Sequence, residues 1–375
     1  MVNRVLGQDV SPNTIERIAL EVGNELEAAE QVQWQSVLSG EVAVPSLAIV
    51  EFDGGRIRTR KADCGPGVHL EGKGWNETKN AIFVSATSEM SEVDPQPEPP
   101  DCFLDADHVS KLAEKVKTTE NADSNGSSPD DDEEQLEQEE PATDKAKHKP
   151  RRLLRTVISS MKNSQEFGRQ MDREAKRRRF DEAERKAFVA DGLPCNWSIH
   201  AEHFEDYVPI LDFTHAVSYL FNASIACFGQ SQEAWRIYCV WMKDAWQGDL
   251  GTVINELKLH QDRIGLPPED VDEEDPREQL RRVIGYLENN RSRMRYNEYR
   301  QAGLPTTSAW MESAVKEMNY RVKGTEMFWN NPAGAEAILQ IRSASLSDDD
   351  RLVRLLTNRP GQTYLRRSPT ARQAA

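Results

Sequence analysis

The chain has 375 residues, of which 38% are hydrophobic and 29% are charged, and its formal net charge is −16. Globular domains usually have about 45–50% apolar residues, so we expect part of this chain to lie outside any packed core. No run of about eighteen apolar residues could span a membrane, and the first residues lack the apolar core of a signal peptide. The five cysteines are scattered without a C-x-x-C pair, which argues against a disulfide framework and a zinc finger. We therefore expect a cytoplasmic protein with reduced cysteines.

Charge is strongly segregated along the chain. Residues 120–140 carry ten acidic and no basic side chains, and residues 145–186 carry fifteen basic against six acidic ones. Residues 351–375 carry six arginines and no acid. Because the distribution of charge matters more for partners than the sum, a nucleic acid remains an expected partner despite the negative total.

Residues 11–30 predict the first helix. Ser11 can cap it, Pro12 suits its first turn, and its apolar residues fall on one face. It is either a packing helix or the second half of a helix-turn-helix.

Strands are expected next. Residues 47–52 and 56–60 predict two strands that are joined by a tight turn at Asp53-Gly54-Gly55. Residues 80–85 predict a third strand. This order implies the antiparallel start of a mixed sheet.

The middle of the chain is rich in charge. A short helix is expected over residues 109–116, and the acidic segment 118–150 is expected to be a disordered linker or a loop insertion. Residues 151–186 are helical in period and basic, and include the run Lys176-Arg177-Arg178-Arg179. This run is either a solvated helix face or a surface that contacts phosphates.

Two later strands end in an aspartate. Residues 187–190 form a short apolar run that stops at Asp191-Gly192, and residues 207–211 form another that stops at Asp212. We expect a helix after each, and the second of these helices covers residues 213–226.

The last part of the chain is predicted to be helical. Residues 227–300 read as all-helical, and their aromatic stripe is expected to be core rather than a platform for stacking bases. A loop over 303–308 precedes a helix over 309–323, and one more helical segment and a basic tail follow. The polar side of the helix over 309–323 carries Glu312, Lys316, Asn319 and Lys323.

Three carboxylates stand out by position: Asp53, Asp191 and Glu312. The order of strands and helices is that of an RNase H-like domain, where the first and fourth strands end side by side and a late helix crosses the same edge. Carboxylates placed there can hold two divalent ions about 3.5–4 Å apart, and Mg²⁺ prefers such oxygen ligands. Each residue also has an ordinary interpretation, as a turn aspartate or, for Glu312, as a surface residue paired with Lys316.

Asp212 and His215 form a D-x-x-H pair at the start of a helix, on one helical face. Asp212 is either a helix cap or a supporting residue beside the metal site, together with His215. It is also the second choice for the second metal-binding carboxylate, after Asp191.

Several segments resemble the insertion-sequence transposases of the ISKra group, which are DDE transposases allied to the Mutator-like superfamily. The resemblance covers about residues 5–355. The segments that carry it are V-E-F-D-G-G-R-I-R-T-R (50–60), C-G-P-G-V-H (64–69), W-N-E-T-K-N (75–80), F-V-A-D-G-L-P-C-N-W (188–197), P-I-L-D-F-T-H-A (209–216), N-R-S-R-M-R-Y (290–296) and G-L-P-T-T-S-A-W-M-E-S-A-V-K-E-M-N-Y-R-V-K-G-T-E-M-F-W (303–329).

The resemblance implies an RNase H-like catalytic domain that cleaves the ends of its own element and transfers the 3′-hydroxyl to target DNA. It implies Asp53, Asp191 and Glu312 as ligands of two Mg²⁺ ions, for which Mn²⁺ can substitute. It identifies Asp212 and His215 with the C/D-x-x-H motif, and residues 227–300 with the all-helical insertion of that superfamily. Family members often have a longer N-terminal region that binds the element ends, so a truncated N-terminal segment is implied here.

The predicted fold is thus α/β: an RNase H-like mixed sheet flanked by helices, with an all-helical insertion and an N-terminal helical segment. The expected partner is DNA, and the expected contacts with it are Lys176, Arg177, Arg178, Arg179, Lys316, Asn319 and Lys323. We expect the protein to bind DNA as a homodimer or a larger assembly and to be associated with the nucleoid. A membrane and a small-molecule substrate are not expected. The alternatives are a non-catalytic DNA-binding remnant of a transposase and a nuclease without strand transfer. The expected units are 1–44 (N-terminal helical segment), 45–117 and 151–226 (catalytic domain), 118–150 (acidic linker), 227–300 (insertion), 301–350 (catalytic and C-terminal helices) and 351–375 (basic tail).

Overall fold

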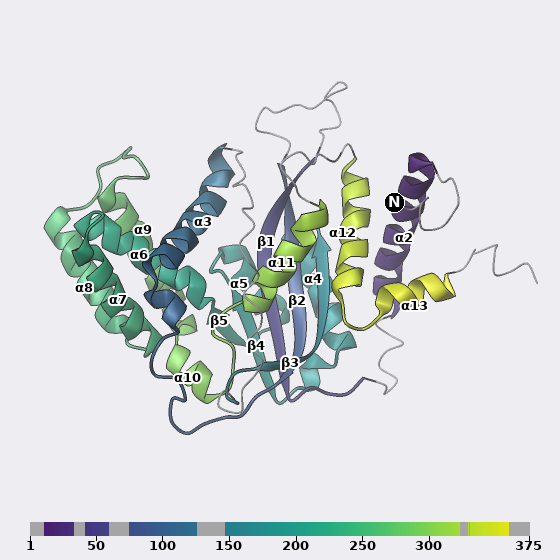
Figure 1. Ribbon diagram of the computed structural model, residues 1–375, viewed down its shortest axis with the longest axis horizontal. Helices are drawn as coiled ribbons and strands as arrows, with labels where there is room; N and C mark the ends of the chain where they lie inside the picture. Colours follow the sequence, from purple (N-terminus) through teal and green to yellow (C-terminus); the bar gives the residue numbers. More distant parts are fainter. Residues whose placement is uncertain are drawn as a thin grey trace, which may run out of the picture.

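One five-stranded mixed sheet organises the chain in the computed structural model, which describes residues 11–33, 42–59, 75–125, 147–322, 329 and 331–359. The strand order is β3-β2-β1-β4-β5, and helices cover both faces of the sheet (Figure 1). β1 pairs antiparallel with β2, which pairs antiparallel with β3, whereas β4 and β5 run parallel to β1. The chain is therefore a mixed α/β protein, as the sequence predicts. The strands are β1 (Leu47–Arg58), β2 (Trp75–Thr87), β3 (Arg151–Ser160), β4 (Arg185–Ala190) and β5 (Val208–Leu211).

The predicted first helix is confirmed as α2 (Pro12–Gln33), and the Oγ of Ser11 accepts a hydrogen bond from the Thr14 amide at 3.2 Å. α2 packs along α12 (Pro332–Leu346) so closely that a Cβ on Gly23 would lie 2.4 Å from the carbonyl oxygen of Ala337. This contact agrees with a packing helix, one of the two interpretations that the sequence left open.

The predicted turn at Asp53-Gly54-Gly55 is wrong, because β1 continues through it as one strand. Gly54 and Gly55 pair with Lys79 and Thr78 of β2. A Cβ on Gly55 would lie 2.8 Å from the Oγ1 of Thr78, so this glycine permits a close approach between strands rather than a reversal of the chain.

The charged middle of the chain differs from the prediction in two places. The helix expected over 109–116 is α3, a longer helix (Ala106–Asn125), so it covers the start of the predicted linker. Most of that linker, residues 126–146, lies outside the described residues. The first part of the predicted basic helix is strand β3, and its α-helical part is α4 (Ser164–Arg177), which a 3-10 turn over Phe180–Glu182 follows. Pairing with β2 and the β-branched run at 156–158 outweigh the helical period there.

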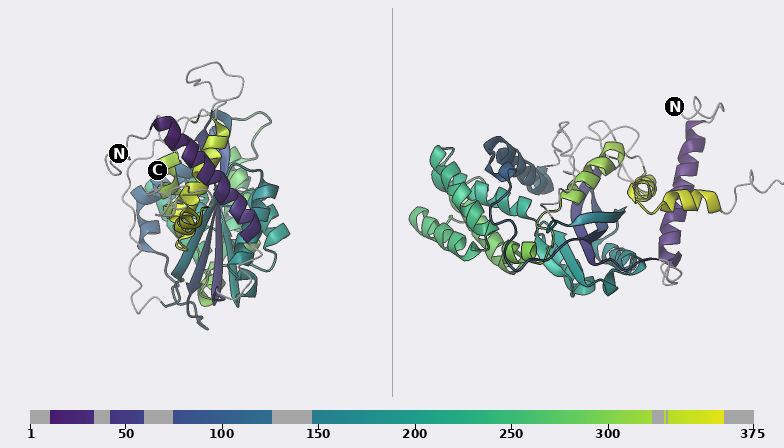
Figure 2. Two further views of the ribbon diagram at one scale, coloured as in Figure 1. Left: turned by 90° about the vertical axis from the view of Figure 1, so that its right-hand side faces the viewer. Right: turned by 60° about the horizontal axis from the view of Figure 1, so that its bottom comes forward.

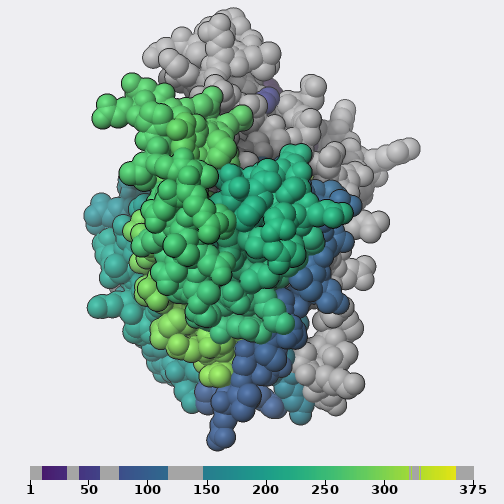
Figure 3. Space-filling model, turned by 90° about the vertical axis from the view of Figure 1, so that its left-hand side faces the viewer, coloured from purple at the N-terminus to yellow at the C-terminus, as the bar shows by residue number. Residues whose placement is uncertain are grey.

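The two strands that end in aspartates are confirmed as β4 and β5. Each is followed by a helix, α5 (Pro194–His203) and α6 (Phe213–Phe228). The described part of 227–300 is helical, as predicted, and stacks beyond β5 at one end of the molecule (Figures 1 and 3). Its helices are α7 (Gln232–Trp246), α8 (Leu250–Ile264), α9 (Pro276–Asn290) and α10 (Tyr296–Gln301).

The aromatic stripe of this helical group is core, as predicted. Tyr238, Trp241, Met242 and Trp246 are buried in the cluster that also covers one face of the sheet. At the opposite end of the molecule, α2 crosses α12 and α13 (Arg351–Asn358) (Figure 2). No helix in the described part of the chain is long and apolar enough to cross a bilayer.

Candidate functional site

Three aspartates occupy corresponding positions on three neighbouring parallel strands. Phe52 of β1 pairs with Ala190 of β4, which in turn pairs with Leu211 of β5. The next residue along each strand is Asp53, Asp191 and Asp212, respectively. Since neighbouring strands lie about 4.8 Å apart, the three backbone positions lie side by side at one edge of the sheet.

Asp53 and Asp191 are half-buried and close enough to repel each other. Burial, and then the Asp191 carboxylate, raise the pKa of Asp53 to about 7, although the charges of His215 and Lys115 oppose this rise. Burial also raises the pKa of Asp191, whose Oδ1 accepts hydrogen bonds from the Leu193 amide, at 3.0 Å, and from the side chain of Asn196. The two carboxylates are thus held close together without enough neighbouring positive charge to offset their repulsion.

Glu312 joins this group from helix α11 (Ala309–Val322), where it lies in the first turn. Burial raises the pKa of Glu312, and Asp212 raises it further, whereas Lys115, His215 and Lys316 lower it. Lys115 and His215 therefore act on both Asp53 and Glu312. The shared charges place the three predicted carboxylates in one electrostatic cluster.

His215 lies among the carboxylates. Burial by itself would lower its pKa, but the charges of Asp212, Asp191, Asp53 and Glu312 outweigh burial and raise it. His215 is on α6, one turn after the strand end at Asp212, so the i, i+3 spacing brings it to the site.

Asp212 has a different environment from Asp53 and Asp191. It is almost completely buried, with 1% of its surface exposed. Its Oδ1 accepts from the Thr214 amide at 2.9 Å and caps α6, and its Oδ2 accepts from the Ser308 hydroxyl at 2.6 Å. Both carboxylate oxygens are thus engaged in holding the loop before α11 against α6.

Two residues of the site were missed by sequence reasoning. Glu51 is fully buried, and its Oε2 accepts from the Met311 amide at 2.7 Å. Burial raises the pKa of Glu51 well above its usual value. A lone acid in the apolar run 47–52 was the signal for it. The second is Lys115 on α3, whose positive charge lowers the pKa values of Asp53 and Glu312. No local pattern in the sequence marks it.

The donor chemistry of this cluster suits Mg²⁺, because hard cations prefer carboxylate oxygens and a bound cation would relieve the repulsion that raises these pKa values. The side chains are not already closed around an ion. Among the described residues, no group of three or more His, Cys, Asp or Glu side chains is arranged so that it could hold a metal. The predicted metal ligands therefore stay a prediction.

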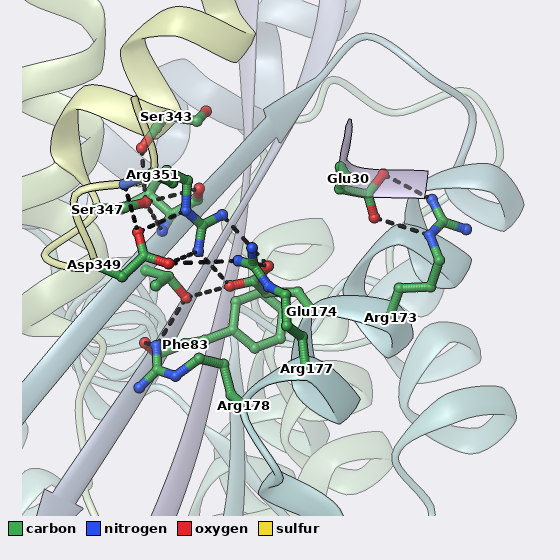
Figure 4. A network of polar contacts seen from close by, with 12 residues as sticks. Glu30, Phe83, Arg173, Glu174, Arg177, Arg178, Ser343, Ser347, Asp349 and Arg351 are labelled. Carbon is green, nitrogen blue, oxygen red and sulfur yellow. Dashed lines mark hydrogen bonds and ion pairs between the residues drawn. The ribbon is translucent and has the colours of Figure 1, made fainter. Parts of the chain in front are cut away.

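The basic run 176–179 is mostly engaged within the protein, which corrects the expectation that all four residues contact DNA. Arg178 is buried, and its guanidinium donates to the Oγ1 of Thr156 at 2.9 Å and to a cluster of backbone and hydroxyl oxygens. Arg177 binds Glu174 and keeps little exposed surface (Figure 4). Their burial argues against contacts with phosphates.

The remaining predicted DNA contacts are divided. Lys176 is exposed and binds Asp172 at 2.8 Å, and Arg179 binds Glu182 at 2.6 Å. Lys316 is exposed and Asn319 is half-buried, both on α11. Lys323 lies outside the described residues.

The comparisons with known proteins give no family for this chain. No family model matches it, and no curated protein matches it significantly. Its function is therefore argued from the geometry above.

Proposed function

We propose that this chain is a DDE transposase with an RNase H-like catalytic domain, which cleaves DNA at the ends of its element and joins them to target DNA. The strand order β3-β2-β1-β4-β5 supports the fold, with β1 central and only β2 antiparallel to the other four strands. The contact between α11 and β1 supports it as well, because a late helix then crosses the edge where β1 and β4 lie side by side.

The observation that carries the proposal is the convergence of Asp53, Asp191 and Glu312 from three separate elements. Two of them lie level on adjacent parallel strands, and all three have pKa values raised by burial and by neighbouring carboxylates. Perturbed carboxylates of this kind cluster at functional sites. Asp191 is preferred over Asp212 as the second ligand because both oxygens of Asp212 are engaged elsewhere.

In this proposal Asp53, Asp191 and Glu312 hold two Mg²⁺ ions. When bound there, the ions would supply activation of the attacking water or 3′-hydroxyl and stabilisation of the leaving oxygen. His215 balances the charge of the carboxylates when it is protonated. Asp212 positions the loop that leads into α11.

The DNA partner is proposed to contact Lys316 and Asn319 on α11, two turns or less from Glu312, together with Lys176 on the surface of α4. Their contacts would be with phosphates and would depend on salt. Because two element ends must be joined, a homodimer or larger assembly on DNA is part of the proposal.

Mn²⁺ binding by calorimetry and cleavage of a plasmid that carries the element ends test the proposal together. Asp53→Asn, Asp191→Asn and Glu312→Gln are each expected to abolish both while the protein stays folded. Glu233→Gln is the matched control, because Glu233 is an exposed carboxylate on α7 that pairs only with Arg236 in the described structure. Unchanged Mn²⁺ binding in the three site variants would contradict the proposal.

A non-catalytic DNA-binding protein of the same fold is the second candidate. It would keep the fold and the exposed cations Lys176 and Lys316 but would neither bind metal ions nor cleave DNA. DNA binding without Mn²⁺ binding or cleavage would identify it. A nuclease without strand transfer would give cut but never joined products.

A further inference from the structure

The first turn of α11 is held by a carboxylate from β1 instead of by its own cap residue. Ser308 precedes the helix, and its carbonyl accepts the first helical hydrogen bond, from the Glu312 amide. A serine at this position usually accepts through its hydroxyl from an amide two or three residues later. Here the Ser308 hydroxyl donates to Asp212, and the Met311 amide donates to Glu51 at 2.7 Å.

Glu51 is an unusual residue for its place in the sheet. It lies on the central strand with no exposed surface, and it pairs with Ile82 on one side and Val189 on the other. Its Oε1 is buried and has no hydrogen-bond partner among the described residues. A buried polar atom without a partner costs free energy, so packing alone does not explain an acid at this position.

The position of Glu51 connects two parts of the candidate site. Glu51 and Asp53 are two residues apart on one strand, so they lie on the same face of the sheet, about 7 Å apart along β1. On the other side of the hydrogen bond, Met311 is the immediate neighbour of Glu312. One hydrogen bond thus joins the strand that carries Asp53 to the helical turn that carries Glu312.

We propose that Glu51 is a positioning residue, which sets the separation between Asp53 and Glu312 by anchoring the first turn of α11 to β1. This inference rests on the proposed function, because the separation matters for holding metal ions. The contact between Ser308 and Asp212 anchors the same turn to α6, so the turn is fixed from two directions.

Four variants separate positioning from a general effect on stability. Glu51→Gln keeps a side-chain carbonyl that can accept from the Met311 amide, and Glu51→Met keeps the length but has no acceptor. Glu51→Asp keeps the carboxyl group but is one methylene shorter. Ile49→Val is the control, because Ile49 is buried on the same strand and face.

The experiment measures thermal unfolding, hydrogen exchange of the backbone amides of α11, and Mn²⁺ affinity by calorimetry. We expect exchange at 309–312 to be about tenfold faster, and Mn²⁺ affinity about tenfold weaker, in Glu51→Met and in Glu51→Asp. Glu51→Gln is expected to keep the exchange rates and the Mn²⁺ affinity close to those of the wild type, and Ile49→Val is expected to change neither. If Glu51→Met does not fold, Glu51→Asp decides the question.

Three results would overturn the inference. The first is wild-type Mn²⁺ affinity in a folded Glu51→Asp or Glu51→Met variant. The second is loss of Mn²⁺ binding in Glu51→Gln with normal exchange, which would make Glu51 a ligand. The third is wild-type protein that binds no Mn²⁺, which ends the proposed function as well; the exchange rates then still report whether Glu51 anchors α11.

Discussion

Carboxylates gather in two regions of this molecule, and the charges that surround them differ in sign. Glu174 on α4 accepts from Thr156 at 2.6 Å and from Arg351 at 2.7 Å, and it also binds Arg177 (Figure 4). Burial alone would raise the pKa of Glu174, but the two arginines hold it well below its usual value. Asp53, by contrast, has a pKa raised to about 7 by burial and by Asp191.

The comparison separates a structural carboxylate from a candidate functional one. The network around Glu174 contains its own cations and joins α4, β3 and the C-terminal helix α13 into one unit. The group around Asp53 contains more acids than bases, so a bound cation would stabilise it. An excess of negative charge is therefore what we expect of a cation site, whereas a balanced network of charges is what we expect of a purely structural contact.

The largest expected effect is in the balanced network. Arg351→Met leaves Glu174 buried with one fewer cation, and we expect it to reduce the free energy of unfolding by about 3–5 kcal/mol. Urea denaturation measures this loss. Arg354→Met is the control, because Arg354 is 64% exposed and its pairing with Asp349 is worth about 0–1 kcal/mol. Equal effects in the two variants would remove the contrast between the two regions.

A smaller effect is expected from adding the missing cation. Mn²⁺ at about one hundred times its dissociation constant should stabilise the wild type by about 2.7 kcal/mol. The gain arises because the ion binds the folded site and not the unfolded chain. Denaturation of Glu312→Gln with and without Mn²⁺ should show no gain, while Glu233→Gln should behave like the wild type. A gain of the same size in Glu312→Gln would show that the ion binds elsewhere.

The metal-free protein should respond to pH through Asp53. A folded-state pKa of about 7, above that of the unfolded chain, gives stability that is present at low pH and lost as the pH rises through about 7. Asp53→Asn cannot ionise, so we expect it to be more stable than the wild type at pH 8 and nearly equal to it at pH 4. Unfolding in chelator at both pH values measures this difference, and a destabilised variant at pH 8 would refute it.

The smallest effect concerns the DNA surface. Lys316→Ala is expected to weaken binding to duplex DNA across all sequences and to lower the slope of log affinity against log salt by about 1. Arg178→Met should leave that slope unchanged, because the Arg178 guanidinium is buried. Fluorescence anisotropy at several salt concentrations measures both slopes. A loss of slope in Arg178→Met alone would restore the original expectation for the basic run.

Local signals in the sequence were enough to predict several elements of the site. The strand endings at Asp191-Gly192 and at Asp212 were predicted, since an apolar run that stops at a turn or cap residue needs only neighbouring residues to be recognised. Gly192 has a φ of 98°, which glycine readily adopts. The helix that carries Glu312 was predicted over residues 309–323 and is α11 (Ala309–Val322).

Only the tertiary structure decided features that depend on distant residues. Gly54 and Gly55 read locally as a turn, yet pairing with β2 keeps them extended. Arg178 read as a surface cation, yet oxygens of β2 and β3 bury it. Glu51 and Met311 are 260 residues apart, so no local pattern could join them. The sequence by itself determined the elements that short-range capping and periodicity specify, while pairing and burial between remote segments decided the register, the buried charges and the positioning of the site.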